Sequence, residues 1–191
     1  MRSLKMLLGA VFLLSCSGMG VGQTASPPSW KTTGDALNID LDVIQQQFVS
    51  TADAMAEDKF SFAPTNGEFK GVRTFAQQVK HVAAVNYYFG GAILGEKPPV
   101  DRGGENGPDS LKSKAEIMKF LNDSFAYLHK SIATITEQNQ MELVEAEGQK
   151  VPRISVASFA IAHPMDHYGQ MVEYLRMNGI IPPASRPQQG R

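Results

Sequence analysis

The fold is decided by the stretch SVASFAIAHPMDHYGQMVEYLRMNG, residues 155–179. Its apolar residues recur at helical spacing, so that Val156, Phe159 and Ala160 fall on one face of the predicted helix. Gly179 then stops the helix, because glycine readily takes the left-handed conformation that closes many helices. The stretch therefore predicts a long amphipathic helix over about 155–178.

Two histidines lie in the middle of that apolar face. Residues four apart project from nearly the same side of a helix, so His163 and His167 can donate nitrogens to one metal ion. Gln170 lies on the same face, and Asp166 lies at its edge, where it can orient a ligand. The alternative is that these polar atoms satisfy one another or bind buried water, and that Asp166 is merely solvated.

Three further segments have helical periodicity, at about 38–57, 74–94 and 113–135. The connection over 95–112 is rich in proline and glycine and is too long for a tight turn, so the chain can cross over the bundle there. No segment alternates with a period of two. The sequence predicts an all-α four-helix bundle with a long crossover between the second and third helices.

A third histidine, His81, lies in the second of these helices, near the edge of its apolar stripe. Three imidazoles from two facing helices form an open metal site. His129, the fourth histidine, lies off the main stripe of its helix and is expected to be solvated. The residues thus predict a metal site formed by His81, His163 and His167, with a satisfied polar core as the alternative.

The first residues predict export. Arg2 and Lys5 give a basic start, residues 6–15 are almost uninterrupted apolar residues, and small residues follow as far as Gly22. This three-part pattern is typical of a secretory signal and is too short to span a membrane as a mature helix. We therefore expect a signal peptide at 1–22, a tether at 23–37, the bundle at 38–183 and a disordered tail at 184–191.

The only cysteine, Cys16, ends the apolar run. The sequence Leu13-Leu14-Ser15-Cys16 resembles a bacterial lipobox, in which the cysteine becomes lipidated. The alternative is a chance cysteine in a signal that is cleaved near Gly22. The expected location is the periplasm, or the cell envelope through a lipid anchor.

Charge and motifs exclude several other functions. The formal net charge is −1 and the isoelectric point about 6.4, and no run of lysine and arginine forms a basic patch, so nucleic-acid binding is not expected. No glycine-rich phosphate loop, CxxC pair or Ser/His/Asp arrangement offers a rival site.

The sequence resembles the DinB-like superfamily, a group of bacterial metal-binding four-helix bundles. The resemblance covers about 41–185 and rests on three runs: residues 75–88 (FAQQVKHVAAVNYY), Pro64-Thr65 upstream of them, and 163–170 (HPMDHYGQ) continuing into 174–183 (YLRMNGIIPP). It implies an up-down-down-up bundle and a divalent metal, zinc or nickel, held by one histidine of the second helix and two of the fourth. Those positions match His81, His163 and His167.

Two classes of function stay open. The first is a metal-dependent enzyme, a hydrolase or a thiol-S-transferase, acting on an unknown small molecule. The transferase fits an exported protein poorly, because low-molecular-weight thiols are cytoplasmic. The second is a non-catalytic module of the envelope that binds metal or ligand and could form a homodimer. Polar groups that converge beside the metal would favour an enzyme, and a closed site would favour a structural role.

Overall fold

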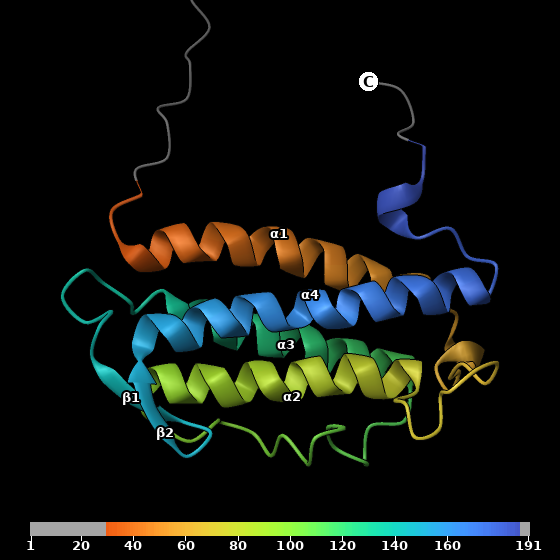
Figure 1. Cartoon of the computed structure of the whole chain (residues 1–191), viewed down its shortest axis with the longest axis horizontal. Helices are drawn as coiled ribbons and strands as arrows, with labels where there is room; N and C mark the ends of the chain where they lie inside the picture. The colour runs from red at the N-terminus through yellow and green to blue at the C-terminus, as the bar shows by residue number, and fades with distance from the viewer. Residues whose placement is uncertain (1–29, 188–191) are drawn as a thin grey trace, which may run out of the picture.

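A computed structural model describes residues 30–187 of the protein. The predicted signal peptide with Cys16 lies outside the described residues, as do residues 23–29 of the tether and 188–191 of the tail. The elements of the described part follow in this order (Figure 1): α1 (Thr33–Ala54), η1 (Glu57–Lys59), α2 (Phe75–Leu94), α3 (Lys114–Ile132), β1 (Leu143–Ala146), β2 (Gln149–Pro152), α4 (Arg153–Met177) and η2 (Pro183–Ser185).

The four long helices form a bundle, as predicted. Helix α2 lies against α3 and α4, and α1 lies against the same two helices (Figure 1). Burial of their apolar side chains is the main stabilising contribution. The largest side chains that are fully buried are Leu41, Phe48, Met55, Phe75, Ile93, Ile117, Leu121, Phe125, Leu128, Ile132, Ile135 and Met171.

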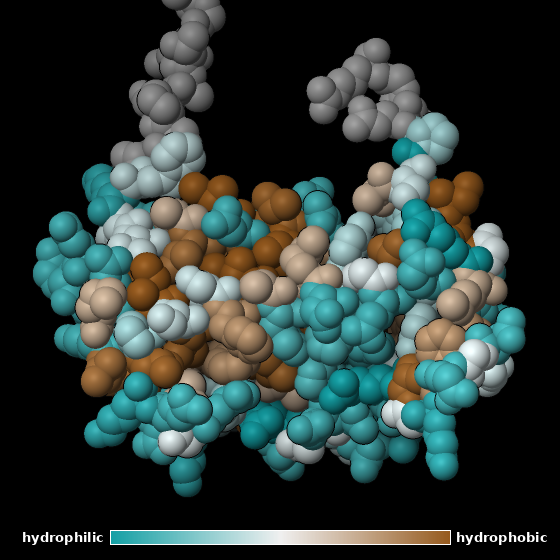
Figure 2. All heavy atoms as spheres, viewed as in Figure 1, coloured by the Kyte–Doolittle hydropathy of each residue, from teal (hydrophilic) through white to brown (hydrophobic). Residues whose placement is uncertain are grey.

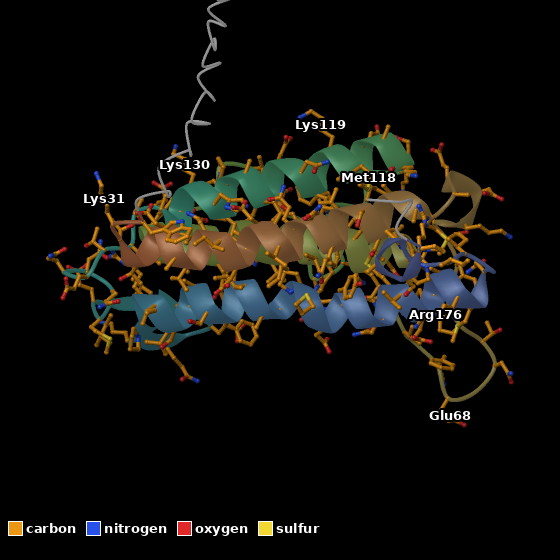
Figure 3. All side chains as sticks on the ribbon, turned by 90° about the horizontal axis from the view of Figure 1, so that it is seen from above. Lys31, Glu68, Met118, Lys119, Lys130 and Arg176 are labelled. Atoms are coloured by element: carbon orange, nitrogen blue, oxygen red, sulfur yellow. The ribbon has the colours of Figure 1, made fainter. Side chains whose placement is uncertain are left out.

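Most charged side chains lie on the outside of the bundle, where Lys119, Lys130 and Arg176 point away from the helices (Figure 3). Apolar side chains also reach the surface, and many of them gather on the half of one face that holds the start of α4 (Figure 2). Phe159 of α4 and Val43 of α1 are among the large exposed ones. Within residues 30–187, no helix has both the length and the apolar character that crossing a membrane requires.

Three helices begin with capping boxes, in which the N-cap hydroxyl and the side chain three residues later satisfy each other's backbone N–H. The predicted box at Ser113 is present, and further boxes begin at Thr32 and Thr74. The box at Thr32 makes α1 start at Thr33, earlier than the predicted residue 38. The predicted tether therefore ends sooner. The first turns of α1 were missed in the sequence because they have a cap but little apolar periodicity.

The long connection between α2 and α3 is fixed to α2. It begins at Gly95, which closes α2 with φ 72°, and it runs along the outside of the bundle (Figure 1). The Nζ of the buried Lys80 donates a hydrogen bond to the Pro108 carbonyl at 2.9 Å. A Cβ at Gly107 would lie 2.6 Å from the Cβ of Lys80, so only glycine allows this approach. The connection is thereby held beside the residue that precedes His81.

The structure also contains a β-hairpin, so the prediction of an all-α domain was wrong in this detail. Strands β1 and β2 pair antiparallel, with Val144 opposite Val151. Their turn is Glu147-Gly148, with φ 51° and 72°, which is the backbone of a tight two-residue hairpin turn. Strands of four residues are too short to show alternation in a sequence window.

Residues 184–187, the first four of the predicted disordered tail, have a defined conformation. Pro183–Ser185 form the short helix η2, which lies against α1. The Nε of Arg186 donates to the Ile181 carbonyl at 3.1 Å. The ordered domain thus extends a few residues beyond the boundary predicted at 183.

Gly34 is where the start of α1 meets the end of α3. Its N–H donates to the Ile135 carbonyl at 2.9 Å, and a Cβ on it would lie 2.4 Å from the Ile132 carbonyl oxygen. We expect Gly34→Ala to lower the free energy of unfolding by about 1–3 kcal/mol, because backbone must move to admit the methyl group. Urea denaturation measures this change.

The matched control is Gly169→Ala. Gly169 is exposed on α4, and apart from its chain neighbours and the nearby backbone of its own helix no atom lies within 4 Å of its would-be Cβ. Alanine there should raise stability by about 0.5–1 kcal/mol through helix propensity. Equal stability of the two variants would show that α1 does not need the close contact at Gly34.

Candidate metal centre

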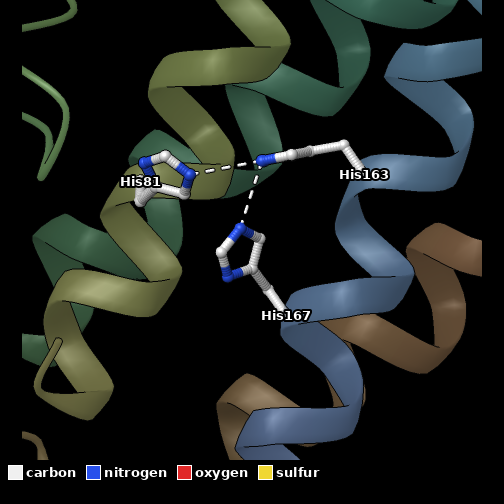
Figure 4. A group of neighbouring side chains, drawn as sticks. All are labelled: His81, His163 and His167. Atoms are coloured by element: carbon white, nitrogen blue, oxygen red, sulfur yellow. Dashed lines mark hydrogen bonds between the residues drawn. The ribbon is translucent and has the colours of Figure 1, made fainter. Parts of the chain in front are cut away.

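Three histidine rings from two helices turn toward a common point (Figure 4). The Nε2 of His163 lies 3.2 Å from the Nε2 of His81 and 3.1 Å from the Nε2 of His167. Two nitrogens bound to one tetrahedral zinc ion lie about 3.4 Å apart, given a zinc–nitrogen bond of about 2.1 Å. One nitrogen of each ring lies within 4.8 Å of the others, so the group could hold a metal ion.

The surroundings keep these rings neutral, as metal ligation requires. Burial, together with the neighbouring rings of His167 and His81, lowers the pKa of His163 to about 3. Burial, with the nearby His81, lowers the pKa of His167 to about 4. Burial also lowers the pKa of His81, although a hydrogen bond from its ring to the Glu105 carbonyl opposes the shift.

The hydrogen bond of His81 fixes its tautomer. Its Nδ1 contacts the carbonyl oxygen of Glu105, and a carbonyl can only accept, so Nδ1 carries the hydrogen. The Nε2 atom is then left with a lone pair that faces His163 (Figure 4). Glu105 belongs to the long connection between α2 and α3, which Lys80 holds against α2, so this connection takes part in the site.

A chain of side chains fixes the tautomer of His167 in the same way. An ionised carboxylate only accepts, so Asp166 receives the Nε2–H of Gln170 at 3.1 Å. The Oε1 of Gln170 then accepts from the Nε2 of Gln78 at 2.8 Å. The Oε1 of Gln78 is left to accept from the Nδ1 of His167 at 2.6 Å. The Nε2 of His167 therefore presents a bare lone pair to the centre.

Sequence reasoning missed one member of this chain. Asp166 and Gln170 were expected near the ligands, and the structure connects both to His167 through Gln78. The side chain of Gln78 lies in α2, one turn before His81, and the residue is only 2% exposed. A glutamine among the apolar residues of that stripe was the signal that could have revealed it.

The ring of His163 lies between those of His81 and His167, and within the described part of the chain no hydrogen bond orients it from the far side. Within residues 30–187 the buried Nδ1 of His163 has no hydrogen-bond partner. The ring also lies beside Phe159, with centroids 6.1 Å apart. Its tautomer is therefore free, and the ring can present its Nε2 either as a donor or as a ligand.

A cavity of about 430 Å³ opens beside two of the three histidines. Polar groups converge on it together with aromatic rings, which is the arrangement expected of a binding site for a small molecule. Its lining consists of His81, Ala84, Val85, Tyr88, Phe89, Arg102, Glu105, Glu147, Phe159 and His163. Asp166 is not among these residues.

Two expectations about side chains near the helix faces were wrong. His129 is not a solvated flank: it is half-buried, and its ring contacts Asn38 at 2.8 Å and Gln45 at 2.7 Å, which joins α3 to α1. A helical wheel of α3 alone cannot show that α1 covers this side. Phe159, expected in the apolar face of α4, is 55% exposed because it lies at the cavity.

Comparison with known proteins agrees with the resemblance seen in the sequence. The sequence pattern of the DinB superfamily matches residues 40–171. The fold is similar to the crystal structure of a DinB-like protein from Bacillus cereus ATCC 10987, with a TM-score of 0.63, 14% identity, and coverage of 81% of this chain and 98% of that chain. No curated protein matches the chain. Because the family pattern extends over most of the bundle and includes all three histidines, the chain belongs to the DinB superfamily.

Proposed function

We propose that this protein binds one divalent metal ion through the Nε2 atoms of His81, His163 and His167. The observation that carries the proposal is the fixed tautomer of two rings. The Glu105 carbonyl and the Gln78 amide each take an Nδ1 hydrogen, which leaves two bare nitrogens facing the third ring. Neutral imidazoles suit zinc and nickel among divalent ions, and we propose one of these two.

The site further supports a role in binding and transforming a small molecule. Three protein ligands leave a coordination position open, and a divalent ion there supplies Lewis acidity to a bound group. The cavity beside the triad brings Arg102, Tyr88 and Glu147 within reach of such a group. We propose a metal-dependent enzyme, either a hydrolase or a thiol-S-transferase.

A second candidate is a non-catalytic metal- or ligand-binding module. The position of Asp166 favours it, because this carboxylate, the nearest to the ligands in sequence, does not line the cavity and so is not placed there as a general base. Turnover of a substrate by the metal-loaded protein, lost on substitution of Glu147 at the cavity rim, would decide for the enzyme.

Export and topology complete the proposal. The basic and apolar start of the chain supports export to the periplasm or attachment to the envelope by a lipid. The length of the connection between α2 and α3 supports the up-down-down-up order of helix directions.

Elemental analysis of protein purified without chelator tests the metal site. We expect about one equivalent of zinc or nickel in the parent protein, from the three-nitrogen donor set. His163→Ala and His167→Ala should lose it, while the control His129→Ala should keep it, since His129 lies between α1 and α3. A parent protein that stays metal-free after incubation with both ions would refute the proposal.

The hydrogen-bonded chain should matter for affinity although none of its members is a ligand. We expect Gln78→Leu to weaken zinc binding about 10- to 100-fold, because His167 loses the partner that fixes its tautomer. Asp166→Asn should have a smaller effect, since it removes only the group that sets the direction of the chain. Competition with a chromogenic chelator measures both affinities, and the exposed Gln46→Leu is the control. Parent-like affinity of Gln78→Leu would exclude this role.

The metal-free protein should lose stability as the pH falls. An unfolded histidine has a pKa of about 6.5, whereas the folded values are about 3 for His163 and about 4 for His167. Between these limits the unfolded chain binds protons that the folded chain does not, so the free energy of unfolding falls on acidification. The slope is at most about 1.4 kcal/mol per pH unit for a fully buried ring and is smaller for the half-buried His163.

Urea denaturation in the presence of chelator at pH 7, 6 and 5 measures this slope. The variant His167→Leu should show a flatter decline than the parent, because it lacks one of the rings that resist protonation in the fold. Parallel declines in parent and variant would mean that the pKa of His167 is not lowered in the folded protein.

A further inference from the structure

We propose that the cavity beside the triad binds a small organic monoanion with an apolar body. The negative head lies between the histidine triad and the guanidinium of Arg102, and the body lies against Phe89 and Phe159. This inference rests on the proposed metal site and names the class of molecule that the site takes.

The first argument is the state of Arg102. Its guanidinium lies over the ring of Tyr88, 5.0 Å from the centroid, a cation–π contact that holds the group in place. Among the ion pairs of residues 30–187, none includes Arg102. A half-buried arginine that is held by a ring and has no carboxylate partner keeps its N–H groups free for a carboxylate ligand.

The support of Arg102 is itself built into the fold. The hydroxyl of Tyr88 accepts a hydrogen bond at 2.6 Å from the backbone N–H of Glu147, at the tip of the hairpin. Glu147 adopts φ 51°, a left-handed conformation that is costly for a residue other than glycine. The strained tip thus fixes Tyr88, and Tyr88 in turn positions Arg102.

The second argument is the charge of the cavity. Two acidic residues line it: Glu105 forms an ion pair with Arg73 at 3.4 Å, and Glu147 has no such partner within the described chain. The free cation of Arg102 and a divalent ion in a neutral triad outweigh the single charge of Glu147. A monoanion is therefore attracted, and Glu147 disfavours groups with a second negative charge.

The third argument is the aromatic wall. Phe89 and Phe159 lie in edge contact, with centroids 5.3 Å apart, and Phe159 also lies beside His163. A further hollow of about 230 Å³ continues past the same two rings beneath the hairpin, toward Val151 and Val156. Phe159 is 55% exposed, and an apolar body lying on its ring would remove that surface from water.

The test uses zinc-loaded protein of measured zinc content and three probes: 3-phenylpropionate, its neutral amide 3-phenylpropionamide, and acetate. Isothermal titration calorimetry should show binding of 3-phenylpropionate that is at least about tenfold tighter than that of the amide, which lacks the charge. Acetate should bind more weakly than 3-phenylpropionate, because it has the carboxylate but lacks the apolar ring. Phe159→Ala should weaken the binding of 3-phenylpropionate and leave that of acetate unchanged.

Arg102→Gln is the decisive variant. It should weaken the binding of 3-phenylpropionate about tenfold or more without changing the zinc content. Arg176→Gln, which removes an exposed cation of α4, is the matched control and should bind like the parent. Glu147→Gln should bind the anion at least as tightly as the parent, since a repelling charge is gone.

The outcomes separate this inference from the metal site. Zinc-loaded protein that binds none of the probes, or that binds the acid and the amide equally well, would overturn the anion site while leaving the metal site intact. Equal affinity of parent and Arg102→Gln would do the same. A parent protein that takes up no zinc would refute the proposed function itself, and this inference with it.

Discussion

A carboxylate can accept hydrogen bonds but cannot donate them, and the arrangement of the candidate centre depends on this constraint. Because Asp166 can only accept, the amide of Gln170 has one orientation, and the amide of Gln78 follows from it. The Nδ1 of His167 must then carry the hydrogen, so the bare Nε2 of this ring faces the centre. A surface charge on α4 thus determines the state of a buried nitrogen through two amides, one of them on another helix.

The long connection between α2 and α3 has a comparable role on the other side of the triad. A long link between α2 and α3 is topologically convenient, but here its backbone also supplies the acceptor for His81. Lys80 and Gly107 hold the link close enough for this to happen, each in a way that depends on its chemistry: the lysine by donating to a carbonyl, the glycine by lacking a side chain. Fold and site are therefore stabilised by the same contacts.

The sequence was sufficient for the helices and for the three histidines. Helical spacing located four amphipathic segments, and the four-residue separation of His163 and His167 indicated that both could bind one metal ion. The Glu105 carbonyl could not be predicted, because a backbone acceptor has no side-chain signature. The hairpin was missed since its strands are too short for a periodic signal, and the position of His129 depends on a neighbouring helix that its own wheel does not contain.

Strand β2 ends at Pro152 and α4 begins at Arg153, so no residue separates the hairpin from the helix that carries two of the histidines. The hairpin is therefore joined directly to α4, and Glu147 at its tip lines the cavity. Its turn can change in length or composition without shifting the histidines along their helix. In such a design the shape of the entrance and the position of the ligands can evolve separately.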